Sequence, residues 1–243
     1  MAGTLFEATT SDQEAKAAHW KNFLKQKKYV TDSIKRIDFS QEHPVVFDAD
    51  GRKFVIDFIN DRTNYHKKKL SLKNEILSKA VGGGRYGMRV LDLSAGLGID
   101  AVFLAQLGYD VVAVERNPLI YLCLENALET LKANNSLLAA KLKFHFSSAQ
   151  DFITEQSEAF DVVYFDPMFP QKAKSALPRQ EMVFFINLVG SDDDATEVVR
   201  KVLNLKNIKR LAVKRPLAAP ALLQPNGQIK GKLIRYDIYG VNA

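Results

Sequence analysis

The stretch RVLDLSAGLGIDAVFLA, residues 89–105, changes its character twice within a short length of chain. It opens as an apolar strand that ends at Asp92, passes through a turn that holds Gly96 and Gly98, and continues as a helix that begins near Asp100. Glycines suit such a turn because they tolerate tight backbone conformations and let a ligand approach the main chain. The stretch therefore predicts a strand, a ligand-binding turn and a helix.

Apolar runs and segments of helical length alternate along the rest of the chain. Residues 195–203 carry apolar side chains at helical spacing behind the acids 192–194, which predicts an amphipathic helix. Residues 229–240 follow an Asn-Gly turn and predict a closing strand or hairpin. Strands that alternate with helices predict an α/β fold, with a mainly parallel sheet covered by helices on both faces. The predicted strands of this sheet are residues 90–93, 111–114, 142–146, 162–165 and 211–213.

The first part of the chain has a different pattern. We expect residues 1–84 to form a small α+β lobe with a connecting helix, and residues 85–243 to form the α/β domain. A cluster of glycines at residues 82–87 marks the joint between the two parts. The elements predicted for the lobe are a helix at residues 11–27, two strands at 45–48 and 53–59 joined by a turn at Gly51, and a short helix at 71–81.

Composition excludes several classes of protein. The chain has 243 residues, of which 47% are hydrophobic, enough to bury a full core. No run approaches the roughly 18 apolar residues of a membrane span, and the start of the chain lacks the pattern of a signal peptide. Cys123 is the only cysteine, and the four histidines stand far apart without ligand spacing. We therefore expect a cytoplasmic protein with no disulfide, no membrane segment and no metal ion.

An acid stands at the end of the second predicted strand, in VVAVERNP, residues 111–118. A carboxylate at this place, on Glu115, can accept hydrogen bonds from both ribose hydroxyls of a nucleoside cofactor. The alternative is a solvated acid that caps the helix beginning at Pro118. If the cofactor interpretation holds, Ser147 and Ser148, which follow the third strand, lie beside the adenine and offer it polar hydrogens.

The glycine turn admits a second class of cofactor. The pattern Gly96-x-Gly98-x-x-Ala101 also fits the fingerprint of dinucleotide-binding proteins, so an NAD-dependent oxidoreductase has to be considered. Asp92 favours another cofactor, because an acid before the glycines attracts a cationic amino-acid moiety and repels a pyrophosphate.

The third motif is VVYFDPMF, residues 162–169, which places an acid, a proline and an aromatic ring after an apolar strand. The Asp166 carboxylate and the Pro167 carbonyl can accept the two hydrogens of an exocyclic amine while that nitrogen attacks a methyl group. The Phe169 ring can stack on the base that carries the amine. A loop whose prolines merely end the strand is the alternative reading. The residues predict catalysis of amine methylation by Asp166, Pro167 and Phe169.

These motifs together resemble the class I S-adenosylmethionine (SAM)-dependent methyltransferases, with DPMF as a variant of the amino-methyltransferase motif Asp/Asn/Ser-Pro-Pro-aromatic. The ordered set LDLSAGLGIDA, ERNP, SS, DPMFPxxxKSA, EM, LVG, VKRP and RYDIYG resembles more closely the ribosomal RNA small subunit methyltransferase J family. That resemblance runs over about residues 89–240. It implies a Rossmann-like fold, SAM as the cofactor, and methylation of a guanine 2-amino group in 16S rRNA.

The resemblance also implies particular cofactor contacts. Ile99 stands where the family usually has arginine, so only a backbone contact is carried over there. The family has a glycine-rich run where this chain has residues 65–70, so no role is carried over to them. Besides Asp92, Gly96 and Gly98 of the turn, the implied cofactor-binding residues are Ile99, Asp100, Glu115, Arg116, Ser147, Ser148 and Asp166.

Basic residues bear on the substrate. The net charge of +6 is compatible with a polyanionic partner but does not establish one. Basic side chains that follow the fourth and fifth strands are expected at the same edge of the sheet as Asp166, where they can neutralise RNA phosphates. The partner is then 16S rRNA or the small ribosomal subunit. The predicted RNA-binding residues are Lys172, Lys174, Arg179, Lys214 and Arg215.

Three other functions remain open on the residues alone. The same amine chemistry serves an amino-methyltransferase that acts on another nucleic-acid base or on a protein glutamine. The glycine pattern leaves an NAD-dependent oxidoreductase. A catalytically idle RNA-binding relative is the third.

Overall fold

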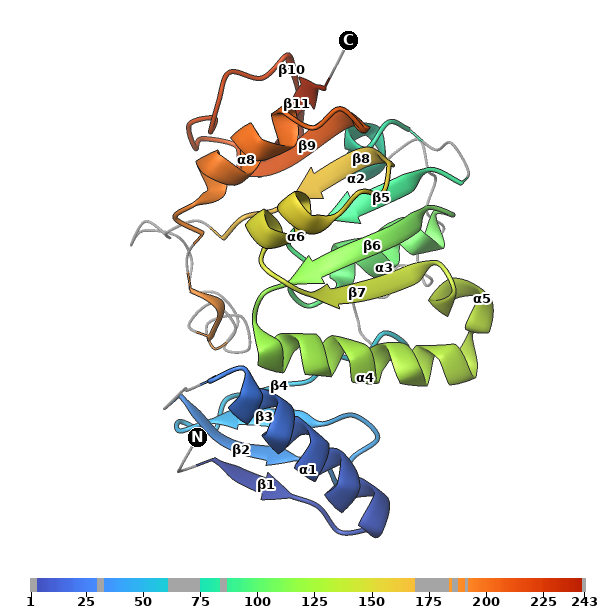
Figure 1. Cartoon of the computed structure of the whole chain (residues 1–243), viewed down its shortest axis with the longest axis vertical. Coiled ribbons are helices and arrows are strands. Elements are labelled where there is room, and N and C mark those ends of the chain that lie inside the picture. Colours follow the sequence, from blue (N-terminus) through green and yellow to red (C-terminus); the bar gives the residue numbers. More distant parts are fainter. Residues whose placement is uncertain are drawn as a thin grey trace.

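The computed structural model describes residues 4–29, 33–60, 75–83, 87–168, 184, 188–190 and 192–241. Its larger sheet has seven strands in the order β10-β11-β9-β8-β5-β6-β7 (Figure 1). Strands β5 to β9 are parallel, whereas β11 pairs antiparallel with both β9 and β10. The strands are β5 (Arg89–Asp92), β6 (Asp110–Glu115), β7 (Leu142–Phe146), β8 (Phe160–Phe165), β9 (Ile208–Pro216), β10 (Gly227–Lys230) and β11 (Ile234–Gly240).

Helices cover both faces of this sheet. Neighbouring residues along β5 and β8 are buried in different clusters, because side chains of a strand alternate between its two faces. Helices α2 (Ile76–Ala80), α3 (Ile99–Gln106) and α4 (Pro118–Asn134), the last continued by α5 (Ser136–Ala139), contribute to one cluster. Helices α6 (Ala149–Glu155) and α8 (Ala195–Leu203) contribute to the other. The predicted α/β class and the mainly parallel sheet are confirmed.

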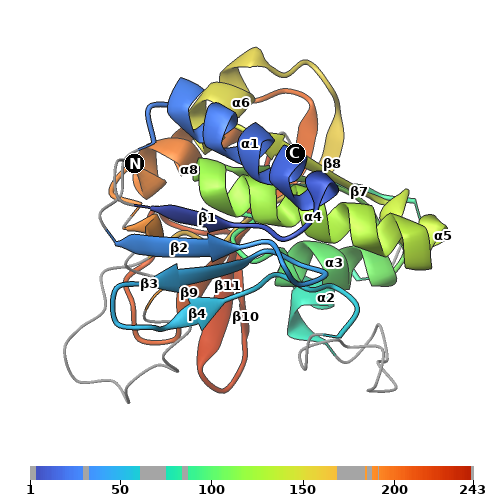
Figure 2. The ribbon, with the colours of Figure 1, turned by 90° about the horizontal axis from the view of Figure 1, so that it is seen from below.

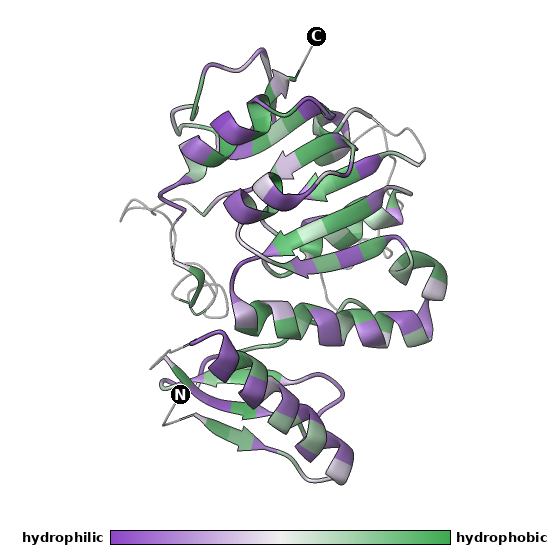
Figure 3. Cartoon of the chain, viewed as in Figure 1, coloured by the Kyte–Doolittle hydropathy of each residue, from purple (hydrophilic) through white to green (hydrophobic). Residues whose placement is uncertain are grey.

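Helix α8 has the amphipathic pattern that the sequence predicts. Val198, Val199 and Val202 are buried against the sheet, and polar residues lie between them (Figure 3). The hydrophobic face is therefore sufficient to explain why this segment docks on the sheet.

The N-terminal residues form a smaller sheet in the order β1-β2-β3-β4, with strands β1 (Leu5–Glu7), β2 (Ile34–Asp38), β3 (Val45–Asp48) and β4 (Lys53–Phe54). The predicted hairpin is confirmed: β3 and β4 pair antiparallel, and Gly51 in the turn has a φ of 76°. The second strand ends at Phe54, earlier than predicted. Helix α1 (Ser11–Gln26) begins at a capping box made by Thr10 and Gln13.

The small lobe packs directly on the larger sheet and its helices. Phe23 of α1 contacts the rings of Tyr121 on α4 and Phe146 on β7, and α1 lies beside α4 (Figure 2). Phe58 stacks on Phe144 with ring centroids 5.9 Å apart. One hydrophobic cluster therefore runs without a break from the lobe into the larger sheet. Among the described residues, no helix combines the length and apolar character needed to cross a bilayer.

Candidate active site

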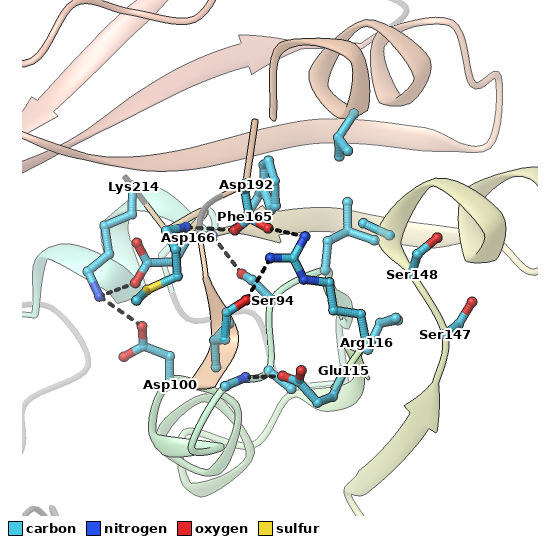
Figure 4. Close-up of a pocket in the computed structure, with 18 of the residues that line it drawn as sticks. Ser94, Asp100, Glu115, Arg116, Ser147, Ser148, Phe165, Asp166, Asp192 and Lys214 are labelled. Carbon is cyan, nitrogen blue, oxygen red and sulfur yellow. Dashed lines mark hydrogen bonds and ion pairs between the residues drawn. The ribbon is translucent and has the colours of Figure 1, made fainter. Parts of the chain in front are cut away.

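A cavity of about 390 Å³ opens at the carboxyl edge of the larger sheet. This size lies within the range of about 300–1,000 Å³ that is usual for small-molecule sites. Figure 4 shows Lys214 and Asp166 at one end of the cavity and Ser147 and Ser148 at the other, with Glu115 between them. Each of these residues stands at or near the end of a parallel strand, so the topology alone collects them.

The turn between β5 and α3 forms the floor of the cavity. Gly96 and Gly98 have φ values of 53° and 75°, a region that side-chain-bearing residues rarely adopt. A Cβ atom at Gly98 would lie 2.8 Å from Leu124 Cδ2 and 2.9 Å from the Phe58 ring. Glycine is therefore required at this position by both conformation and space.

Asp92, at the end of β5, stabilises the start of this turn through hydrogen bonds with Ser94. Its Oδ1 accepts hydrogen bonds from the Ser94 amide at 2.9 Å and the Ser94 hydroxyl at 3.2 Å. The side chain is 1% exposed, and burial raises the pKa of its carboxyl to about 7. The structure thus places Asp92 against Ser94, beneath the lining of the cavity, whereas the sequence predicts a direct contact with the cofactor.

Glu115 is held in a fixed orientation at the end of β6. Its Oε2 accepts from the Gly96 amide at 2.9 Å and its Oε1 accepts from the Asn117 amide at 2.7 Å. Burial raises the pKa of this carboxyl to about 7. The N-cap of α4 is Asn117, whose side chain accepts from the Leu119 and Ile120 amides. The alternative reading of Glu115 as the helix cap is therefore wrong.

Arg116 and Asp192 join the end of β6 to the backbone after β8. Arg116 Nη1 lies 2.8 Å from Asp192 Oδ1, and its Nη2 donates to the Val189 carbonyl at 3.1 Å. Asp192 Oδ2 accepts from the Met168 amide at 2.7 Å, and the Asp192 amide donates to the Met168 carbonyl at 3.1 Å. From the sequence, Asp192 is only an acid before a helix. No local sequence pattern indicates that Asp192 contacts Arg116 or Met168, which lie far from it in the sequence.

Lys214, predicted to bind RNA, lies inside the cavity. Its Nζ is 2.8 Å from Asp166 Oδ2 and 3.1 Å from Asp100 Oδ2. Tyr164 donates its hydroxyl hydrogen to the same Asp100 oxygen at 2.6 Å. Burial is the largest influence on Asp166 and raises the pKa of its carboxyl, which Lys214 opposes.

The other predicted residues differ in where they lie. Arg215 is 4% exposed and donates to the Pro220 carbonyl, so its charge is not presented on the surface as predicted. Successive side chains of a strand point to opposite faces, so Lys214 and Arg215 lie on opposite faces of β9. Ser147 and Ser148 line the cavity, and Ser148 also caps α6. Four predicted residues, namely Phe169, Lys172, Lys174 and Arg179, fall outside the described residues, as do residues 65–70.

The fold and the site define the class of protein. A parallel sheet with a glycine turn after β5, an acid at the end of β6 and Asp-Pro after β8 is the arrangement of a class I SAM-dependent methyltransferase. A family profile described as "Putative SAM-dependent methyltransferase" matches residues 29–241. The crystal structure of a SAM-dependent methyltransferase from Neisseria gonorrhoeae has the same fold, with a TM-score of 0.73 at 23% identity over 99% of this chain and 96% of that one.

Two similar proteins identify the family. Ribosomal RNA small subunit methyltransferase J of Bdellovibrio bacteriovorus is 40% identical over 96% of this chain and 94% of that protein. The protein of the same name from Marinobacter nauticus is 35% identical over 84% of this chain and 77% of that protein. The chain belongs to the ribosomal RNA small subunit methyltransferase J family, as its motifs indicate, and SAM is its cofactor. Membership of this family excludes the NAD-dependent alternative.

The residues of the cavity suit SAM. Glu115 lines the cavity with a carboxylate, a group that can accept from ribose hydroxyls, and Asp166 and Asp100 add negative charge, which suits a cationic sulfonium. Apolar side chains such as Ile99, Val114 and Met168 complete the lining. Among the described residues, no group of three or more His, Cys, Asp or Glu side chains could hold a metal ion.

Proposed function

We propose that this protein transfers a methyl group from SAM to the exocyclic 2-amino group of a guanine in small-subunit ribosomal RNA. The observation that carries the proposal is the position of Asp166 and Pro167 at the end of β8, where Asp166 lines the cofactor cavity. The name of the relatives supports ribosomal RNA as the substrate, and the Asp-Pro motif supports an amine as the acceptor.

The cofactor supplies an electrophilic methyl group on a sulfonium. Glu115 would accept hydrogen bonds from its ribose, and Ser147 and Ser148 would offer hydrogen bonds to its adenine. The Ile99 amide and the Asp100 side chain would bind near its methionine portion. Arg116, paired with Asp192, forms part of the cavity lining. Asp166 lies at the end of the cavity opposite Ser147 and Ser148 (Figure 4), so a cofactor bound in this order would present its methyl group toward Asp166.

Asp166 and Pro167 prepare the acceptor. The lone pair of an exocyclic guanine amine is delocalised into the ring, so the nitrogen is a weak nucleophile until it becomes tetrahedral. The Asp166 carboxylate and the Pro167 carbonyl accept the two amine hydrogens and so favour that geometry in the transition state. A nitrogen–carbon bond then forms as the sulfur–carbon bond breaks, and the nitrogen gives up one proton to Asp166. Phe169 stacks on the base.

The RNA has to reach this edge of the sheet with its target base unstacked. Lys172, Lys174 and Arg179, which follow the DPMF motif, contact phosphates of the incoming strand, and binding weakens with added salt. The enzyme acts in the cytoplasm, on 16S rRNA or on the small subunit. Methylation of another base or of a protein glutamine is the competing function, since the amine chemistry is the same.

Mass spectrometry of rRNA nucleosides tests the proposal. Cells that lack the gene should lose one N2-methylguanosine from their small-subunit rRNA. Wild-type protein should restore it, and an Asp166→Ala variant produced at the same level should not. If every methylated guanosine persists in the deletion strain, the substrate is wrong, and a missing mark on another base or on a protein would identify the competing function.

A further inference from the structure

Lys214 lies in the lining of the cavity that holds Asp166. Its ammonium group sits between the carboxylates of Asp166 and Asp100, at 2.8 Å and 3.1 Å, and its side chain is only 24% exposed (Figure 4). These two short contacts with partly buried carboxylates engage the lysine charge inside the cavity. A phosphate contact requires that charge to be free at the surface.

Asp166 lies in surroundings that disfavour its ionised form. Burial raises the pKa of its carboxyl, and other acids of the site add to that effect. Lys214 on β9 is the cation that opposes this rise. The titratable groups that face Asp166 from the neighbouring elements are Asp92 at the end of β5, Asp100 on α3, Tyr164 on β8, Asp192 before α8 and Lys214 on β9, with Tyr236 of β11 next to Lys214.

The state of this carboxyl matters for the chemistry proposed above. An ionised Asp166 accepts a hydrogen bond from the substrate amine and can take up the proton that the amine releases. A protonated Asp166 keeps only a weaker, neutral acceptor oxygen and has no capacity for that proton. A cation beside Asp166 therefore favours the ionised carboxylate, the form that can accept the amine proton, at neutral pH.

We propose that Lys214 is a positioning residue for methyl transfer: it keeps the Asp166 carboxylate ionised and oriented toward the acceptor amine. The proposal rests on the proposed function, in which Asp166 accepts from that amine. Asp100 helps to hold Lys214 in place: it accepts from the same ammonium group, and its own carboxylate accepts from the Tyr164 hydroxyl.

Three variants test this role. Lys214→Met removes the charge at similar length, and Lys214→Arg keeps it. Lys209→Met is the matched control, because Lys209 lies on the same strand and pairs with an acid, Asp161, at 2.7 Å, but is 81% exposed and far along β9 from the site. Circular dichroism and S-adenosylhomocysteine binding establish that each variant is folded.

The decisive readout is the pH profile of the methyl-transfer rate in a single turnover, with saturating cofactor and RNA. Without Lys214 the pKa of Asp166 is higher, so the acid limb of the Lys214→Met profile should move to higher pH. The methyl-transfer rate of Lys214→Met should be on the order of a hundredfold below that of the wild type at pH 7, and the difference should be smaller at pH 9. Lys214→Arg should restore the wild-type limb to a large extent, and Lys209→Met should leave it in place.

Two outcomes would overturn the proposal. A uniform loss of rate with the acid limb unmoved means that Lys214 does not act through ionisation of Asp166. A weaker RNA affinity with a reduced salt dependence, at an unchanged profile, means that Lys214 is the phosphate contact that the sequence predicts.

A second measurement separates this proposal from the proposed function. In protein labelled with ¹³C at aspartate carboxyls, the resonance that disappears in Asp166→Asn reports the titration of Asp166 without any substrate. Its midpoint should rise in Lys214→Met, and an unchanged midpoint contradicts the role of Lys214. If wild-type protein methylates no RNA but the midpoint rises, the proposed function fails and the role of Lys214 in ionising Asp166 stands.

Discussion

Two buried acids, Asp92 and Glu115, underlie the cofactor site, and burial raises the pKa of each carboxyl to about 7. The folded pKa of each lies above its unfolded value, so both groups favour the folded state most at low pH. That contribution is lost as the pH rises through about 7. The cofactor-free protein therefore carries acids whose charge changes near neutrality.

Glu115 gives the first prediction. Because the ionised carboxylate is the better acceptor for ribose hydroxyls, the affinity for S-adenosylhomocysteine should rise by about tenfold between pH 6 and pH 8. Calorimetry at a series of pH values measures this. Glu115→Gln should bind more weakly at pH 8 and lose most of the pH dependence. An affinity that is flat in the wild type, or that falls with pH, contradicts the assignment.

At the scale of residues, the sequence predicts those site residues that directly follow a recognisable strand. Glu115, Ser148 and Asp166 follow recognisable strands, and the structure brings all three to one cavity. The partners of Lys214 and Asp192 could not be predicted in this way. They come together only when β8, β9 and α8 are packed in the folded chain.

Among the elements, the β5–α3 turn depends most sharply on one glycine. Gly98→Ala meets both a strained φ of 75° and a contact of 2.8 Å with Leu124, whereas Gly51→Ala meets a similar φ of 76° with no atom within 4 Å. Strain alone costs roughly 1–2 kcal/mol, and overpacking adds about 1–3 kcal/mol. Gly98→Ala should therefore lower the free energy of unfolding by more than Gly51→Ala does, and should also weaken cofactor binding. Denaturant unfolding measures the difference, and equal losses would show that the close packing at Gly98 is relieved at no cost.

Asp192 connects the end of β8 to the start of α8. Asp192→Ala removes the acceptor of the Met168 amide and the partner of Arg116, so the backbone beside Pro167 loses its support. We expect the rate of methyl transfer to fall about ten- to hundredfold with less change in the KM for RNA, because small misplacements at a site cost that much. Asp192→Asn, which keeps an acceptor oxygen, should lose less. Asp193→Ala, at the adjacent exposed residue, is the control. Equal effects of the Ala variants at both positions would contradict this role.

The long periodic elements are those that the sequence predicts well. The parallel strands and helix 195–203 are confirmed because each has enough residues to show its period. Strands β1 and β2 were not predicted. They span only residues 5–7 and 34–38, and the second mixes charged and apolar residues, so neither pattern is long enough to indicate a strand.

At the scale of the whole molecule, the division into a lobe and a domain remains a prediction. The way the two parts pack predicts whether they unfold together or separately. The hydrophobic cluster that contains Phe58 and Phe144 includes residues of both parts, so neither part buries its core alone. The chain should unfold in one cooperative transition. Two separate transitions by calorimetry would show that the parts are independently stable.

Phe58→Ala sharpens that prediction. Phe58 is 8% exposed, and loss of its ring should lower the free energy of unfolding by about 3–5 kcal/mol while the transition stays single. Leu137→Ala is the control, because Leu137 is 83% exposed and its loss should change the stability little. A Phe58→Ala variant in which the lobe melts first would contradict a shared core.

The central claim is that this chain methylates the 2-amino group of guanine in small-subunit rRNA. The most direct measurement incubates the purified protein with methyl-labelled SAM and small subunits or 16S rRNA from cells that lack the gene, then identifies the labelled nucleoside after digestion. The account predicts label in N2-methylguanosine alone with wild-type protein, and none with Asp166→Ala. Label in another nucleoside, or equal labelling by the Asp166→Ala variant, would contradict it.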